Sequence, residues 1–225
     1  CIINRPKIVL FLLIIIALVF GYKSKDFRLD ASSETLLIEG DPDLKYLQEI
    51  NKKFGAKEFL VLTLTPKEKI ISENTINNIL SLKYKIQSLE WVHNTITILD
   101  IPLLDSTDEP LMERIKNFKT LKDENIDKER GFKEILNSPV FRNFVISEDS
   151  KTTGIIVNIK PIEKPQSNAF DNKQELEKYK DSLKKKRHQN IIEIREIIKT
   201  FEDIGKIHLG GIPMIADDMM TFILS

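Results

Sequence analysis

The sequence Phe59-Leu60-Val61-Leu62-Thr63-Leu64-Thr65, closed by Pro66, is the clearest signal of secondary structure in this 225-residue chain. A near-continuous apolar run of this length is typical of a strand that is buried on both faces of a sheet. We therefore expect the first strand of the fold over residues 59–65, with the neighbouring elements assembled around it.

The segments after this strand alternate between helical and extended patterns. Ser72 is a helix-capping residue type, and one apolar stripe follows it as far as Glu90, made of Ile76, Ile79, Leu80, Ile86 and Leu89. From Trp91 to Ile101, β-branched residues alternate with other types, and Pro102 ends the run. The pattern predicts a helix over residues 72–90 and a strand over residues 92–101.

The middle of the chain interrupts this alternation. Residues 103–142 are polar and helical only in pieces, with Pro110 at a helix start, so we interpret them as an insertion. The polar turn 148–151 then lies between the apolar segments 143–147 and 152–159, which is a hairpin pattern. We expect the next strand of the main sheet over residues 152–160.

A long helix and a last strand complete the pattern. The helix is expected over residues 171–204, and only its second half has the apolar spacing that packs on a sheet. Gly205 ends the helix, and residues 206–212 read as a strand. The order is the ferredoxin-like βαββαβ arrangement, an α+β fold in which two helices cover one face of a four-stranded sheet.

The amino-terminal region predicts a transmembrane helix over residues 1–22. Residues 8–22 read IVLFLLIIIALVFGY without a charge, and basic residues flank them, namely Arg5, Lys7, Lys23, Lys25 and Arg28. These fifteen residues reach about 22 Å as a helix, short of the ~30 Å hydrocarbon core, so residues 2–7 must extend the span. A cleaved signal peptide is one alternative, although Val19-Phe20-Gly21 is a poor cleavage site, and a buried core helix is another.

Residues 23–57 form a connecting segment between this helix and the first strand. Asp41-Pro42 combines a capping residue with proline at the first helical position, and Gly55 suits a helix C-terminus. Leu44, Leu47, Ile50 and Phe54 recur at spacings of three and four. We expect a short amphipathic helix over residues 42–54.

The composition excludes several classes of protein. Lys and Arg number 34 and Asp and Glu number 34, so the formal charge is zero, unlike that of a typical nucleic-acid binder. With 41% hydrophobic and 30% charged residues the chain should fold. Its single cysteine, Cys1, excludes an internal disulfide and a cysteine-based zinc site. A lipidated Cys1 is disfavoured, because Ile2 and Ile3 replace the usual polar tether.

Residue types that carry catalysis are not grouped in the sequence. His93, His188 and His208 lack the spacing of metal ligands. A Gly-rich phosphate loop, a G-x-S-x-G elbow and a Cys/His nucleophile pair are all missing from the sequence. The basic run 184–187 reads as a solvated helix face more than as a contact with anionic lipid. We expect neither an enzyme activity nor a metal or cofactor.

Three stretches together resemble a known family. They read FRLDASSETLLIEGDPDLKYLQEINKKFGAKEFLVLTLTP (27–66), ILNSPVFRNFVISEDSKTTGIIVNI (135–159) and LGGIPMIADDMM (209–220). In this order after a first membrane helix, they resemble the amino-terminal part of RND-superfamily exporters, in the branch of the mycobacterial large membrane proteins, hopanoid exporters and Patched-like proteins. The resemblance implies an extracytoplasmic porter domain over residues 58–212 and the start of a second transmembrane helix over residues 213–225.

The resemblance also implies structural roles for single residues. Asp30 and Leu36 match the family's stretch after the first helix, Phe54-Gly55 matches the turn before the first porter strand, and Gly210-Gly211 matches the turn before the second helix. The family's proton-relay carboxylates lie on later membrane helices. Asp217 and Asp218 are expected at the start of a helix, where they complement the helix dipole, with a proton or cation role as the weaker alternative.

By this resemblance the chain is expected to be a fragment of a proton-motive-force-driven exporter of hydrophobic or lipid-like molecules. We expect both ends to be cut, since the chain starts with Cys1 and stops in an apolar stretch. The implied location is the cytoplasmic (inner) membrane with the soluble part outside, and the implied partners are membrane lipid, the second half of the transporter and further copies, not nucleic acid. The alternative is a single-pass membrane-anchored extracytoplasmic binding or assembly domain.

Overall fold

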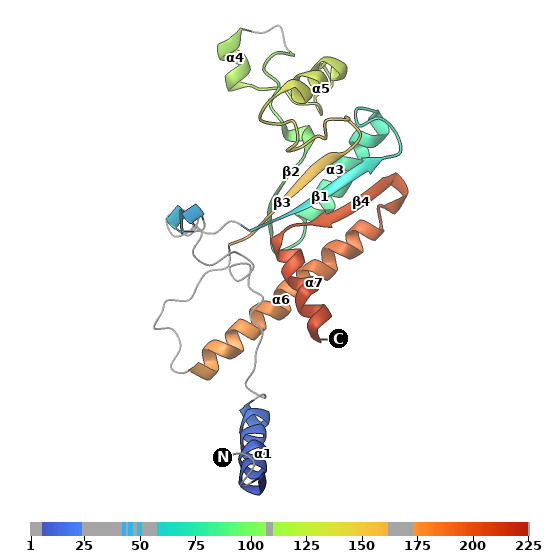
Figure 1. The fold of residues 1–225 in the computed structure, drawn as a ribbon. Coiled ribbons are helices and arrows are strands. Elements are labelled where there is room, and N and C mark those ends of the chain that lie inside the picture. The colour runs from blue at the N-terminus through green and yellow to red at the C-terminus, as the bar shows by residue number, and fades with distance from the viewer. Residues whose placement is uncertain are drawn as a thin grey trace.

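The structure is a computed structural model that describes residues 6–23, 42–43, 45–46, 49–50, 58–106, 110–161 and 173–224. It is an α+β fold built on a four-stranded antiparallel sheet (Figure 1). The strands are β1 (Phe59–Pro66), β2 (Val92–Ile96), β3 (Thr153–Ile159) and β4 (Gly205–Gly210). They lie in the order β2-β3-β1-β4, so the first and third strands of the chain are central.

The expected first strand is confirmed, but its burial differs from the expectation. Leu60, Leu62 and Leu64 are completely buried, whereas Val61 and Thr63 between them are only half-buried. Leu62 lies opposite Ile155 of β3 and Leu209 of β4, so these residues share one face of the sheet. The prediction of burial on both faces is therefore wrong, because helices cover only the face that carries the leucines.

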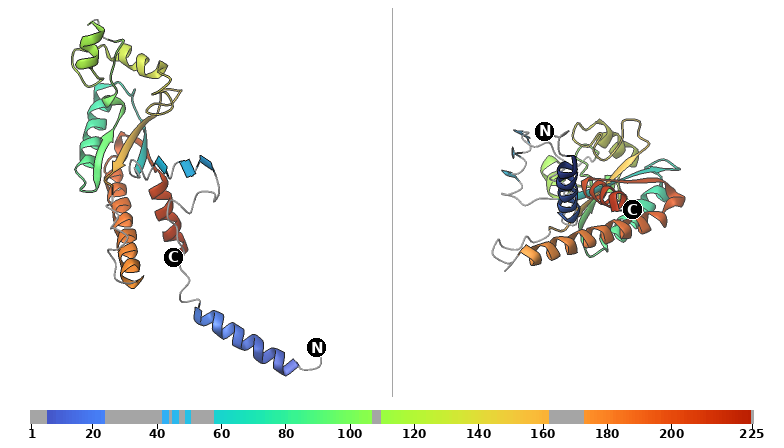
Figure 2. Two further views of the ribbon diagram at one scale, coloured as in Figure 1. Left: turned by 90° about the vertical axis from the view of Figure 1, so that its left-hand side faces the viewer. Right: turned by 60° about the horizontal axis from the view of Figure 1, so that its bottom comes forward.

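Two helices cover that face. They are α3 (Glu73–Gln87), which Ser72 caps as expected through a hydrogen bond from the Thr75 amide, and α6 (Lys173–Lys199). Figure 2 shows both on the same side of the sheet. The second half of α6 contributes Ile191, Ile194 and Ile197 to the core, as the apolar spacing predicted. At about 25 cal/mol per Å² of apolar area, this buried layer is the main source of stability.

The second strand ends earlier than the sequence pattern indicated. β2 stops at Ile96, and a short 3-10 helix, η2 (Ile98–Asp100), replaces the rest of the expected strand. Thr97 and Asp100 form a capping box, in which the Asp100 carboxylate accepts a hydrogen bond from the Thr97 amide at 2.8 Å. Burial would raise the pKa of Asp100, but hydrogen bonds from Lys83 and Thr97 hold it below its usual value.

The insertion between β2 and β3 packs over one end of the sheet. It contains α4 (Leu111–Lys116) and α5 (Lys128–Asn137), and Asp127 caps α5 by accepting from two backbone amides. One core cluster contains Leu64 together with three residues of the insertion that are completely or almost completely buried: Leu103, Leu121 and Ile135. The helical pieces in this region are confirmed.

The hairpin expected before β3 is reduced to isolated bridges. Residues 143–147 contain no strand, although Ile146 pairs with Thr153 and the Gly154 amide donates to the Val145 carbonyl at 2.9 Å. Asn143 has a φ of 64°, which turns the chain out of the extended conformation. The prediction of a regular first hairpin strand is wrong for this reason.

Along the chain, one helix precedes the sheet domain and another follows it. α1 (Pro6–Lys23) stands apart from the sheet in Figures 1 and 2, and its large apolar side chains from Leu10 to Phe20 are exposed. Within the residues that the structure describes, no helix combines the length and the apolar character needed to cross a membrane. Of the helix expected over 42–54, the described residues 42–43, 45–46 and 49–50 are helical, and the others lie outside the described residues.

Candidate functional site

The connection from the sheet to the last helix is a tight turn. β4 ends at Gly210, and α7 (Ile212–Leu224) begins two residues later. Gly211 between them has a φ of +119°, and a Cβ there would lie 3.0 Å from the Phe59 carbonyl oxygen. At Gly210 a Cβ would meet only the Val61 carbonyl oxygen at 3.7 Å, an ordinary contact. Of the two glycines singled out in the sequence, Gly211 is therefore the one that the turn requires.

Asp217 and Asp218 lie in the second turn of α7, beyond its first four residues. They contact α6 and not the amide groups at the start of their own helix. Asp217 accepts from His188 Nδ1 at 2.9 Å, and Asp218 accepts from Arg195 Nη2 at 2.8 Å. The structure thus joins these two residues to partners 29 and 23 positions away in the chain.

These two pairs link α7 to one face of α6. His188 and Arg195 are seven residues apart, so they lie two turns apart on one face of α6. The side chains of Arg195 and Asp218 are 43% and 47% exposed, and a pair so open to solvent contributes only about 0.2–1 kcal/mol. Met214 adds apolar contact with the core, and α7 also packs against β1. The junction is therefore held mainly by packing, and the two polar contacts between α6 and α7 add to it.

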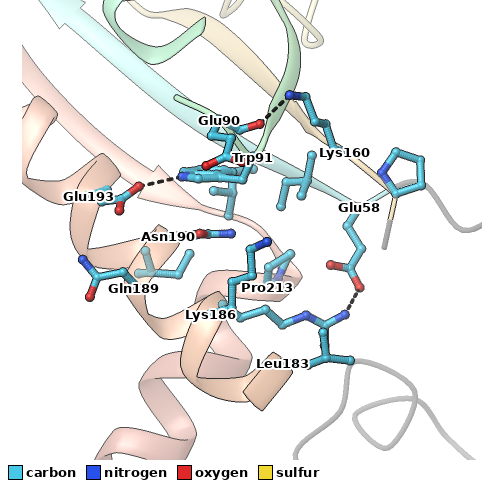
Figure 3. A pocket seen from close by; sticks show the side chains of 15 residues that line it. Glu58, Glu90, Trp91, Lys160, Leu183, Lys186, Gln189, Asn190, Glu193 and Pro213 are labelled. Carbon is cyan, nitrogen blue, oxygen red and sulfur yellow. Dashed lines mark hydrogen bonds and ion pairs between the residues drawn. The ribbon is translucent and has the colours of Figure 1, made fainter. Parts of the chain in front are cut away.

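A cavity of about 600 Å³ lies beside this junction. Its walls come from α6, from the ends of β1 and β3, from the α3–β2 connection and from Pro213 at the start of α7 (Figure 3). Apolar lining is provided by Leu60, Trp91, Ile159, Leu183, Ile191 and Pro213. The volume falls in the range of small-molecule sites in proteins, and the wall combines these apolar residues with polar and charged ones.

The polar groups of the cavity are arranged in two sets. At one end, Trp91 Nε1 donates to the Glu193 carboxylate at 2.9 Å. At the other end, Arg187 Nη2 lies 2.6 Å from the Glu58 carboxylate, while its Nε is buried without a hydrogen-bond partner. An unsatisfied buried donor costs about 1–3 kcal/mol. Lys186, which Figure 3 shows extending from α6 into the cavity, has no ion-pair partner among the described residues.

The remaining residues that the sequence singled out are not brought together in the part of the chain that the structure describes. His93 and His208 are exposed and belong to separate strands, and no group of three or more His, Cys, Asp and Glu side chains that could hold a metal occurs within the described residues. Asp30, Leu36, Phe54 and Gly55 lie outside the described residues. Sequence reasoning missed the cavity, for which the single tryptophan and the basic run 184–187 were the available signals.

Neither a scan of protein-family models nor a search of curated proteins finds a match to this sequence. The candidate site therefore stands on its geometry: a strand-to-helix junction, a hydrogen bond and an ion pair between α6 and α7, and an amphipathic cavity next to them.

Proposed function

We propose that the chain is the first porter domain of an RND-type, proton-driven exporter of hydrophobic or lipid-like molecules. The strand order β2-β3-β1-β4, antiparallel throughout and covered by α3 and α6 on one face, supports a ferredoxin-like arrangement for this domain. The observation that carries the functional proposal is the junction at Gly211, where the edge strand β4 continues directly into the apolar helix α7.

A short junction suits a transporter because it transmits movement. With one residue between β4 and α7, and with α7 tied to α6 through Asp217 and Asp218, a tilt of α7 turns the sheet domain with it. Rocking of one rigid repeat against another is the usual basis of alternating access. Asp217 and Asp218 act in this proposal as positioning residues for α7.

The proposal places α1 and α7 in the cytoplasmic membrane and the sheet domain outside the cytoplasm. Exposed large apolar side chains occur along α1 and on α7 at Ile215, Met219 and Phe222. The 18 residues of α1 reach about 27 Å, slightly less than a hydrocarbon core of ~30 Å. Lys7 and Lys23 at its ends can reach the headgroups by snorkelling.

The test is efflux of a hydrophobic dye from cells that express the complete protein containing this chain. We expect efflux that an uncoupler abolishes, that Gly211→Ala reduces and that Gly210→Ala leaves unchanged. Exposed sites outside the junction, such as Lys122→Gln, provide a second control. Absence of uncoupler-sensitive efflux in membranes that contain the folded protein would refute the exporter.

A second candidate, an anchored binding domain, is favoured by one observation. All the residues that line the cavity belong to this domain. Specific ligand binding without any uncoupler-sensitive efflux would select this candidate over the exporter.

A further inference from the structure

We propose that the cavity between α6 and the start of α7 binds an amphiphile with a single anionic head group, a carboxylate or a phosphate. This inference depends on the proposed function in one respect: a protein in a lipid membrane has such amphiphiles close at hand. The binding chemistry itself follows from the residues that line the cavity.

The charged side chains divide the cavity into two ends. Lys186 and Arg187 lie next to each other on α6 at one end, and Glu193 lies about two turns further along the helix at the other. Glu90 and Lys160 also line the cavity, toward the Glu193 end, so the formal charges of the whole lining cancel (Figure 3). Glu58 neutralises Arg187, and Lys186 has no carboxylate partner among the described residues. The Lys186 end therefore carries an uncompensated positive charge, which favours an anionic group there.

The neighbouring donor supports the same assignment. Arg187 Nε is buried beside the cavity with no hydrogen-bond partner, although Nη2 of the same guanidinium pairs with Glu58 at 2.6 Å. An oxygen of a carboxylate or phosphate held by Lys186 could accept from this N–H group once the Arg187 side chain turns to expose it to the cavity. Guanidinium groups are well suited to such oxyanions because their donors lie in one plane.

The remainder of the cavity is suited to an apolar body. Ile159, Leu183 and Pro213 are partly buried and give the cavity accessible apolar surface, and Trp91, which is 7% exposed, adds part of its ring. The indole N–H of Trp91 is already bonded to Glu193, so the ring presents apolar surface to a ligand. A volume of about 600 Å³ accommodates a chain or ring system of drug size.

Trp91 makes the proposal directly testable, because the chain contains one tryptophan. The full chain is placed in nanodiscs, and dibrominated stearic acid, whose bromine atoms quench indole fluorescence on contact, is titrated in. We expect saturable quenching, with affinity at least tenfold weaker for the uncharged methyl ester of the same acid. Equal quenching by acid and ester, or no saturable quenching, would overturn the proposal.

Two variants test whether the charge of Lys186 is responsible for the binding of the acid. Lys186→Gln should weaken binding of the acid by about three- to tenfold, whereas Lys185→Gln, an exposed neighbour outside the cavity, should leave it unchanged. Equal effects of the two variants would assign the charge dependence to the helix surface in general and would overturn the site.

Brominated lipids in the nanodisc distinguish the two sources of ligand. Quenching by brominated phosphatidylglycerol but not by brominated phosphatidylcholine would identify an anionic bilayer lipid as the occupant, whereas quenching by the free acid alone would identify a soluble amphiphile. Equal quenching by both lipids would show unspecific contact with the bilayer and refute the proposal. Charge-dependent binding without efflux would support this inference and refute the exporter. Efflux without such binding would support the exporter and refute this inference.

Discussion

Replacing Gly211 by alanine should destabilise the sheet domain far more than the same change at Gly210. At Gly211 the φ of +119° is sparsely populated by residues with a side chain, which costs about 1–3 kcal/mol. The new Cβ would also lie 3.0 Å from the Phe59 carbonyl oxygen and 3.2 Å from Leu60 Cα. These are backbone atoms of a central strand and cannot move aside, so we expect a loss near the upper end of that range.

Gly210→Ala is the matched control on the adjacent residue. Its Cβ would meet one atom at 3.7 Å, and alanine restricts the unfolded chain more than glycine does. We expect a change between zero and a gain of about 1 kcal/mol in the free energy of unfolding.

Urea unfolding of the full chain in a non-ionic detergent, followed by the fluorescence of Trp91, measures both variants. Trp91 is 7% exposed in the core cluster that also contains Leu60, so its emission reports unfolding of the sheet domain. With a slope of about 1–3 kcal/mol per molar urea, a loss of about 3 kcal/mol in Gly211→Ala should lower the midpoint by about 1–3 M. Equal midpoints for the two variants would refute the assigned role of the positive φ.

Three further outcomes are expected from the same unfolding assay. Leu62→Ala removes a completely buried side chain of β1 and should cost about 2–5 kcal/mol; a loss below about 1 kcal/mol would contradict the assigned core. The ionised Asp100 stabilises the fold above its unfolded pKa of 3.8, and this contribution disappears as the pH falls through the lower folded pKa. The stability difference between the wild type and Asp100→Asn should therefore be largest near neutral pH and vanish in strong acid. A double-mutant cycle of Arg195→Ala and Asp218→Ala should give a coupling below about 1 kcal/mol, because both side chains are more than 40% exposed; a larger value would mean that the pair, and not packing, holds α7.

The secondary structure was predictable where the signal is local. The apolar run at 59–65, the cap at Ser72 and the isoleucine spacing in the second half of α6 each act over a few residues, and the corresponding elements are present. The two helices end earlier than expected, α3 at Gln87 instead of 90 and α6 at Lys199 instead of 204, where a short 3-10 helix (Glu202–Ile204) follows. The early end of β2 was missed, although its cause is also local. Thr97 and Asp100 are spaced as a capping box, which competes with the extended conformation that the β-branched residues favour.

The candidate site was predictable only in part. Gly210-Gly211 was expected as a turn before a helix, but the sequence does not show which of the two glycines has the positive φ. Asp217 and Asp218 were expected to act on their own helix, whereas they pair with His188 and Arg195 of α6. The cavity was not predicted, because its walls come from residues as distant as Leu60, Trp91 and Pro213.

The amino-acid sequence alone indicates where most of the helices and strands of this protein lie, because propensity, capping and periodicity depend on near neighbours. It also determines that α1 is an apolar helix with charged ends. Only the tertiary structure decides that one face of β1 is covered, that α7 is held against α6 and that Trp91 and Lys186 line the same cavity. Those features depend on contacts between residues far apart in the chain, and such contacts form only when the sheet and its helices pack together.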